Sequence, residues 1–287
     1  MTSGVGPDRP DDLTWMRTVA PEDVHWASRF LDSLVKGRSR RAEWVADCLM
    51  HTQFRAWLAT LLAAVKAHMR TTGQNSGWRN LRSRLTGEAE AGNCTYRHQV
   101  GAIAEAAVLG AAVHRWGAHV ELWPAVLGGR CDVRVAARDV SFYGEVKAMW
   151  REEDRVIGSR YFVPEQLLSQ EVERLLSTIR EAKVQLPRNE PSVCFVLCRH
   201  LQGFGMYPLD AESKKAVYGR VIEAMRADAS ARVDVAAVIH NWNEPDLLSA
   251  DGESLLKPKL LQAFRTCWFP PGQVDAPVGD RPVVCRT

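Results

Sequence analysis

The sequence predicts an α/β fold, in which a central mixed sheet is flanked by helices and preceded by an all-helical region. The first observation is that segments with helical and with strand-like hydrophobic spacing alternate between residues 96 and 240. The second is that the segments before residue 90 carry only helical spacing. Hydrophobic residues make up 46% and charged residues 25% of the 287 residues, as in ordinary globular proteins. We therefore expect a large α/β domain behind a smaller helical region.

The N-terminal part is expected to be disordered at first and then helical. Residues 1–20 are polar and contain Gly and Pro, which favours a disordered terminus. A helical region follows over 21–90. Its first helix opens at Pro21, since Pro and acidic residues suit a first helical turn. A long second helix covers about 42–70, and residues 71–77 have the composition of a loop.

The α/β domain is expected to span 91–269, and a proline-containing tail over 270–287 is expected to be extended or disordered. Its helices show apolar residues at helical spacing, and its interior strands are short, nearly continuous apolar runs. The expected helices cover 96–116, 164–186, 211–226 and 255–261. The expected strands cover 119–123, a hairpin over 129–147, 192–200, 233–240 and 264–269, with a loop over 124–129.

The hairpin brings two acidic residues together. With its turn at 138–139, Asp132 on the first arm lies directly opposite Glu145 on the second, with Cβ atoms about 4.5–5.5 Å apart. Side chains alternate along each arm, so Asp132, Glu145 and Lys147 share one face while apolar residues fill the other. Like charges that face each other in a sheet destabilise it, and a cation between them would relieve the repulsion. The turn lacks the Gly or Asn of tight hairpins, and a slip of one residue would separate the acids.

The hairpin and the elements around it resemble the PD-(D/E)xK nuclease superfamily, over about residues 96–240. The motif that carries the resemblance is Asp132 followed by Glu145, one intervening residue and Lys147. Cys131 stands where the Pro that gives the motif its name would be, and this variation leaves the carboxylates in place. The resemblance implies a restriction-endonuclease-like core and metal-dependent hydrolysis of nucleic acid.

The resemblance also implies a role for each residue of the motif. Asp132 and Glu145 correspond to ligands of Mg²⁺ or Mn²⁺, with the backbone carbonyl of Val146 as a further ligand. Glu105, on the helix before the hairpin, corresponds to an auxiliary acidic ligand, and Lys147 to the residue that activates water. Oxygen ligands suit Mg²⁺, and such an ion neutralises phosphate charge and makes a nucleophile from water. An exposed helix position for Glu105, with no part in metal binding, is an equal alternative.

Two basic clusters are candidates for contact with nucleic acid, since Lys and Arg bind phosphates and Trp stacks on bases. The alternative is that the Arg residues are solvated and that Trp78 belongs to the core. Gln166 and Gln170 lie on the helix after the hairpin, where some relatives in the superfamily carry a polar residue near the site, but an exposed helix face is the expectation for both. The two clusters consist of Lys36, Arg38, Arg40 and Arg41, and of Trp78, Arg79, Arg82 and Arg84.

Composition and charge bear on where the protein is located and on how it could bind nucleic acid. The net charge of +3 is only mildly basic, so any surface for nucleic acid is local. Seven cysteines without a Cys-x-x-Cys pair indicate reduced thiols and a cytoplasmic location. No signal peptide or apolar run long enough to span a membrane is found. We expect a cytoplasmic Mg²⁺-dependent nuclease acting on DNA in preference to RNA, with homodimerisation left open. A catalytically inactive relative that binds nucleic acid or a protein, and a structural protein with solvated hairpin acids, are the alternatives.

Overall fold

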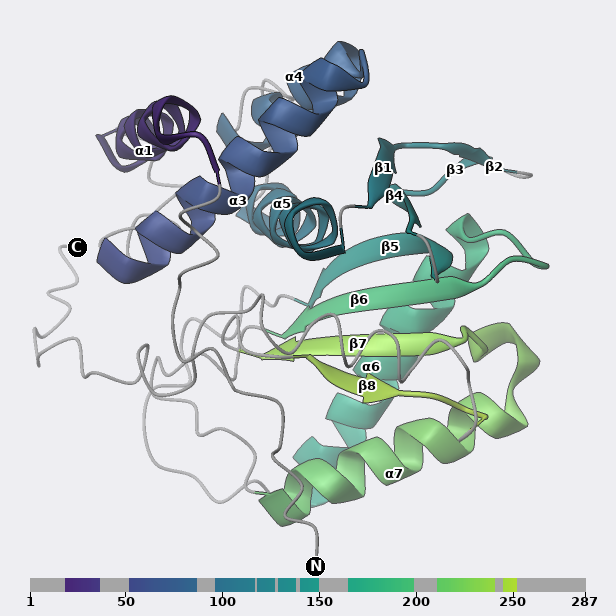
Figure 1. The fold of residues 1–287 in the computed structure, drawn as a ribbon. Helices are drawn as coiled ribbons and strands as arrows, with labels where there is room; N and C mark the ends of the chain where they lie inside the picture. Colours follow the sequence, from purple (N-terminus) through teal and green to yellow (C-terminus); the bar gives the residue numbers. More distant parts are fainter. Residues whose placement is uncertain are drawn as a thin grey trace, which may run out of the picture.

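A computed structural model shows a mixed α/β fold, with a six-stranded mixed sheet and α-helices on both of its faces (Figure 1). The α/β class expected from the sequence is thereby confirmed. The structure describes residues 19–36, 52–86, 96–116, 118–126, 129–137, 140–149, 165–198, 211–240 and 245–251.

The helices and strands follow one another in an order close to the expected one. The helices are α1 (Pro21–Lys36), α3 (Thr52–Thr71), α4 (Asn75–Thr86), α5 (Tyr96–Trp116), α6 (Glu165–Gln185) and α7 (Ala211–Ala227), with a 3₁₀ turn, η4 (Ala229–Ala231). The strands are β1 (His119–Leu122), β2 (Ala125–Val126), β3 (Gly129–Arg130), β4 (Val133–Ala136), β5 (Ser141–Met149), β6 (Ser192–Cys198), β7 (Val235–His240) and β8 (Asp246–Leu248).

The main sheet has the strand order β1-β4-β5-β6-β7-β8. Strands β1, β4 and β5 pair antiparallel, β5, β6 and β7 pair parallel, and β8 closes the sheet antiparallel to β7. Parallel neighbours need a long crossover, and α6 and α7 stand in the sequence between the parallel strands. Strand β5 is therefore the point at which the antiparallel half of the sheet meets the parallel half.

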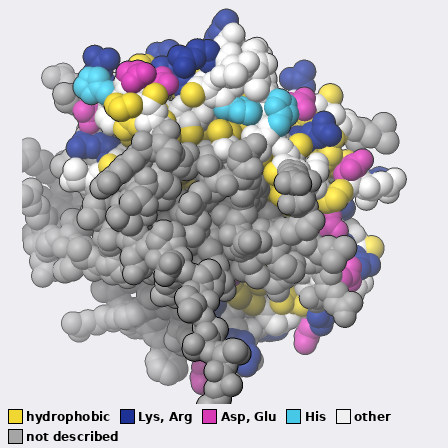
Figure 2. Space-filling model, viewed as in Figure 1, with side chains coloured by type: hydrophobic (Ala, Val, Ile, Leu, Met, Phe, Trp, Pro, Cys, Tyr) yellow, Lys and Arg dark blue, Asp and Glu magenta, His cyan; other side chains and the backbone are white. Residues whose placement is uncertain are grey.

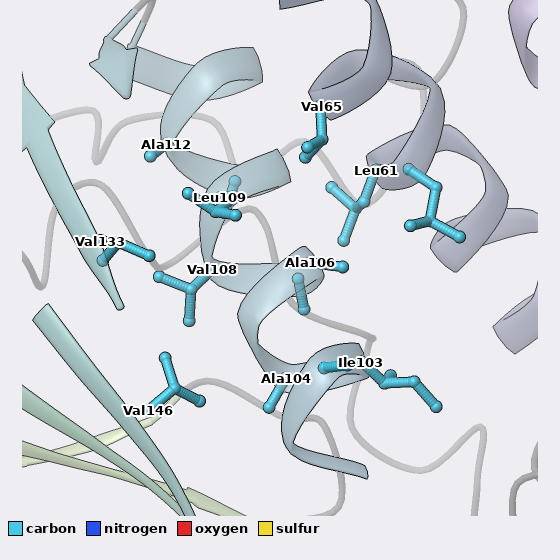
Figure 3. Close-up of a cluster of buried hydrophobic side chains, with 14 of the residues drawn as sticks. Leu61, Val65, Ile103, Ala104, Ala106, Val108, Leu109, Ala112, Val133 and Val146 are labelled. Atoms are coloured by element: carbon cyan, nitrogen blue, oxygen red, sulfur yellow. The ribbon is translucent and has the colours of Figure 1, made fainter. Parts of the chain in front are cut away.

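Helices cover both faces of the sheet. One hydrophobic cluster joins the sheet to α5 and, beyond it, to α3, α4 and α1. Figure 3 shows Val108 of α5 facing Val133 and Val146 of the sheet, while Leu61 and Val65 of α3 lie on the other side of α5. A second cluster joins the opposite face to α6 and α7. Strands covered on both faces read as continuous apolar runs, which is why β6 and β7 were recognisable in the sequence.

The helical region packs onto the α/β part through a close contact between α3 and α5. A Cβ atom built at Gly110 would lie 2.6 Å from the Cβ and 2.9 Å from the Cα of Leu61. Only glycine allows this approach of the two helix backbones. The helices before residue 90 thus share one core with the sheet, while the division of the chain into two units at that point stays a prediction.

Several expected boundaries were wrong. Helix α4 begins at Asn75, inside the expected loop 71–77, because its polar first turn lacks an apolar signal. The expected loop 124–129 contains β2 and the start of β3, which pair with each other. Strand β8 was not expected, since it is only three residues long. The expected elements over 255–261 and 264–269, and the start of the long helix at 42–51, lie outside the described residues.

Within the residues that the structure describes, no helix combines the length and the apolar character that a membrane span requires.

Candidate active site

The hairpin forms in the expected register. Val135 pairs with Phe142 and Val133 with Gly144, which puts Asp132 opposite Glu145 at the next position. The N–H of Ala137 donates to the carbonyl of Val140 at 2.7 Å and closes the hairpin around residues 138–139, which are not among those described. The register prediction is therefore confirmed, although the turn lacks Gly and Asn.

The two opposed carboxylates are fixed by backbone donors from each other's strand. The backbone N–H of Asp132 donates to Glu145 Oε2 at 3.0 Å, and that of Val146 donates to Asp132 Oδ2 at 2.8 Å. Glu145 is 2% exposed. The alternative that the acidic face of the hairpin is solvated is thus wrong for Glu145. Its strand is interior, and the odd-numbered residues of β5 face the side of the sheet that α6 and α7 cover.

Lys147 and Gln185 complete this side of the site. Lys147 Nζ donates to Glu145 Oε1 at 2.8 Å. The amide orientation of Gln185 is assigned from its partners: its nitrogen donates to Glu145 Oε1 at 2.8 Å and its oxygen accepts from Lys147 Nζ at 2.6 Å. The last residue of α6 therefore links the Glu and the Lys of the motif.

Glu105 reaches the same site from α5. Its side chain is 1% exposed, and Arg84 of α4 donates from Nη2 to its Oε2 at 2.6 Å. Its other oxygen, Oε1, is buried and accepts no hydrogen bond from the residues that the structure describes. A buried carboxylate oxygen without a partner costs folding free energy. A proton or a cation bound to this oxygen would reduce that cost. The expected alternative of an exposed Glu105 is wrong.

The charges of the three acids act on one another. Burial raises the pKa of the Glu105 carboxyl to about 8, and the nearby charges of Asp132 and Glu145 add to the shift while Arg84 opposes it. Burial, followed by the charge of Asp132, raises the pKa of Glu145 to about 7. Burial also raises the pKa of Asp132. Each shift marks a carboxylate whose negative charge is poorly compensated by the protein alone.

Gly144 explains how Glu145 can occupy this position. A Cβ atom at Gly144 would lie 2.7 Å from Val133 Cγ2 and 3.1 Å from the ring of Phe195. The strand before Glu145 is therefore held tightly between its neighbours, which keeps the acidic pair in register.

The residues of α4 that were expected to contact nucleic acid differ from one another in burial. Trp78 is half-buried and packs edge-to-face against Trp26 at 5.6 Å between ring centroids, so it belongs to the hydrophobic cluster. Arg79 and Arg82 are exposed on α4, and the Arg82 guanidinium lies 5.9 Å from the ring centroid of Phe30. Figure 2 shows Lys and Arg side chains along the upper edge of the molecule, where α4 lies in Figure 1.

The other residues expected to contact nucleic acid cannot be placed: Arg38, Arg40 and Arg41 lie outside the described residues, as does the side chain of Lys36. The contacts of both basic clusters with nucleic acid therefore stay predictions.

Three side chains at the site were not predicted to lie there. Arg84 was expected on the surface for nucleic acid, but it lies against Glu105. Gln185 was not singled out in the sequence, whereas Gln166 and Gln170 were expected on an exposed helix face; Gln170 is exposed, and the side chain of Gln166 is not described. Trp123 was read only as the end of a strand.

Trp123 has a left-handed backbone conformation, with a φ of 50°, which is uncommon for an aromatic residue. Its N–H donates to the carbonyl of Asp132 at 2.9 Å, and the guanidinium of Arg84 lies 5.0 Å from its ring centroid. Strained backbone of this kind is concentrated at functional sites. A positive φ at a Trp has no signature in the sequence.

The chemistry of the donors fits a hard divalent metal ion. Carboxylate and carbonyl oxygens are the ligands that Mg²⁺ prefers, and Glu105 Oε1 is an unpaired buried acceptor next to two more acids. In the conformation described, several carboxylate oxygens accept hydrogen bonds from the protein instead. Among the described residues, no three His, Cys, Asp or Glu side chains are already arranged around one position that could hold a metal ion.

Comparison with known proteins gives no family for this chain. Neither a protein-family model, nor a curated protein, nor a solved structure matches it. A function must therefore be argued from the geometry of the site.

Proposed function

We propose that this chain is a metal-dependent nuclease that hydrolyses phosphodiester bonds in nucleic acid, DNA in preference to RNA. The observation that carries the proposal is the opposed pair Asp132 and Glu145, fixed by backbone donors and by Lys147, with the buried Glu105 near enough for their charges to act on it. Acids that are held together at a cost in folding free energy are a sign of function. The restriction-endonuclease-like core implied by the motif is part of the same proposal.

Asp132 and Glu145 would hold the metal ion, with the carbonyl of Val146 and with Glu105 as an auxiliary ligand. An ion bound there would neutralise charge on the phosphate and lower the pKa of a bound water. To accept it, the carboxylates must exchange hydrogen bonds that they now receive from Lys147 and from backbone N–H groups.

Lys147 would orient the attacking water. Its ammonium lies 2.8 Å from Glu145 Oε1, so a water near that carboxylate would come within its reach. A positive charge next to the water favours the hydroxide form. Gln185 holds both partners of this pair and so restricts where the ammonium can point.

Helix α4 would guide the substrate toward the site. It contains Arg79, Arg82 and Arg84 and no acidic residue, and Arg84 already lies at the carboxylates. Exposed Arg side chains along one helix supply sequence-independent binding of phosphates.

A second candidate is a catalytically inactive protein of the same fold that binds nucleic acid through α4. The observation that favours it is that the protein's own donors occupy Asp132 Oδ2 and both oxygens of Glu145. Metal binding separates the two candidates.

The test combines calorimetric titration of Mg²⁺ and Mn²⁺ with cleavage of single- and double-stranded DNA and RNA. We expect metal-dependent cleavage by the wild type and none by Glu145→Ala. Glu173→Ala, which removes an exposed acid on α6, is the matched control and should cleave like the wild type. Lys147→Ala should bind the metal but cleave far more slowly. Absence of metal binding that depends on Asp132 and Glu145 would refute the nuclease and favour the binding protein.

A further inference from the structure

Arg84 is held in the acidic site from three directions. Its Nη2 donates to Glu105 Oε2 at 2.6 Å, its Nε donates to Asn80 Oδ1 at 3.1 Å, and its guanidinium lies 5.0 Å from the ring centroid of Trp123. Its positive charge opposes the rise in the pKa of Glu105 and also that of Asp132. Arg84 is thus a fixed part of the site and not a mobile surface residue.

The charges of the site favour one divalent ion over two. When all three carboxyl groups are ionised, Arg84 and Lys147 leave one uncompensated negative charge. One divalent ion turns this into a single positive charge, which an incoming phosphate can neutralise. A second divalent ion would leave three positive charges in a site whose acids are largely buried, and like charges repel strongly there.

We propose that Arg84 is a built-in cation that limits this acidic site to a single divalent metal ion. The inference rests on the proposed function, because it concerns the same metal site. Arg84 occupies Oε2 of Glu105, and so removes that carboxylate from a second ion. Without Arg84, both oxygens of Glu105 would be open to a cation, since Oε1 has no partner among the described residues.

An arginine suits this task better than a lysine or a histidine. A guanidinium keeps its charge at every pH at which proteins function, and its planar donors fit a carboxylate. The restriction to one ion would therefore hold over the whole pH range in which the protein functions.

The experiment counts bound ions. Mn²⁺ is titrated calorimetrically into wild type, Arg84→Gln and Arg84→Lys, and unbound Mn²⁺ is measured by electron paramagnetic resonance. We expect one ion per chain for wild type and for Arg84→Lys, which keeps the charge. Arg84→Gln should bind the first ion about tenfold more tightly or better, because a nearby positive charge is gone, and should bind a second ion.

The double variant Arg84→Gln/Glu105→Gln provides a second measurement if Arg84→Gln alone fails to fold. It removes both members of the ion pair, so no buried charge is left unpaired and the net charge of the site is that of the wild type. We expect one ion, bound more weakly than by the wild type because the auxiliary ligand Glu105 is also lost, and no second ion, because the net charge is unchanged. Circular dichroism and thermal unfolding establish that each variant is folded.

Three results would overturn the inference. Two ions bound by the wild type would show that Arg84 imposes no limit. One ion bound with equal affinity by wild type and Arg84→Gln would also show that Arg84 imposes no limit, while the proposed metal site would stand. No ion bound by any folded variant would refute the proposed function and the inference together.

Discussion

The contact between α3 and α5 offers a sharp test of the packing that positions Glu105. Replacing Gly110 by Ala would put a Cβ atom 2.6 Å from the Cβ and 2.9 Å from the backbone Cα of Leu61. Ordinary contacts begin at 3.4 Å, so the two helices would have to separate by about 0.8 Å, the difference between 3.4 and 2.6 Å. A rotamer change cannot relieve a clash with a backbone atom, and overpacking of this kind costs about 1–3 kcal/mol.

Gly101 in the same helix is the matched control. A Cβ atom there meets nothing within 4 Å, so Gly101→Ala should only gain helix propensity, about 1 kcal/mol. Gly110→Ala has the same gain, and the two variants should differ in free energy of unfolding by the overpacking cost alone. That difference corresponds to roughly 3–10 °C in Tm for a chain of this size.

Urea and thermal unfolding followed by circular dichroism measure this difference. Because α5 carries Glu105, a displaced helix should also weaken Mg²⁺ binding in Gly110→Ala, while Gly101→Ala binds like the wild type. Equal stability of the two variants would show that α3 and α5 do not approach each other as closely as described, and that the placement of Glu105 needs revision.

Three further predictions concern the acids and their neighbours. Without metal, the free energy of unfolding should fall as the pH rises from about 5 to 8.5. In the folded state the pKa values of Glu105 and Glu145 are about 8 and 7, above the ordinary 4.5. Both groups therefore bind more protons in the folded state than in the unfolded state over this range. Thermal unfolding at several pH values measures this, and Mg²⁺ should restore most stability at the alkaline end; a flat profile would contradict the raised pKa values. Asp132→Asn should raise the metal-free Tm by about 2–4 °C, since it removes one of the repelling charges, and should abolish the rise in Tm on adding Mg²⁺; an unchanged response to Mg²⁺ would exclude Asp132 as a ligand. Gln185→Ala should lower kcat about tenfold or more and shift the pH dependence of cleavage, because Lys147 loses a fixed partner, whereas Gln170→Ala, exposed on the same helix, should match the wild type.

Local signals were sufficient for the hairpin. The alternation of apolar and polar residues fixed which face each side chain takes, and the only register that puts Val135 beside Phe142 also puts Asp132 opposite Glu145. A one-residue slip would have turned apolar residues out of the core, so burial selects the register even though the turn has no Gly. The long helices were predictable from other local signals, since α1 has a clear apolar period and opens with Pro and acids, while α5 is rich in Ala.

The surroundings of the acids were not predictable from local signals. Arg84 and Gln185 meet the site only because α4 packs on α5 and α6 crosses β5, and neither contact leaves a trace in the spacing of residues near the motif. The burial of Glu145 was missed for a related reason. A polar residue on one face of a strand suggests solvent, but here a helix covers that face.

Burial of the acids separates the functional interpretation from that of an ordinary solvated hairpin. A solvated pair would cost the protein little and would keep ordinary pKa values. Here Glu105 and Glu145 are almost fully buried, and burial together with the charges of neighbouring acids raises the pKa of both. Among the described residues, Glu105 Oε1 also has no hydrogen-bond partner. Hydrophobic side chains of similar size in these places would remove that cost. The arrangement is therefore explained by what it can bind, and a cation that is drawn to all three acids is the ligand that would recover the free energy lost in bringing them together.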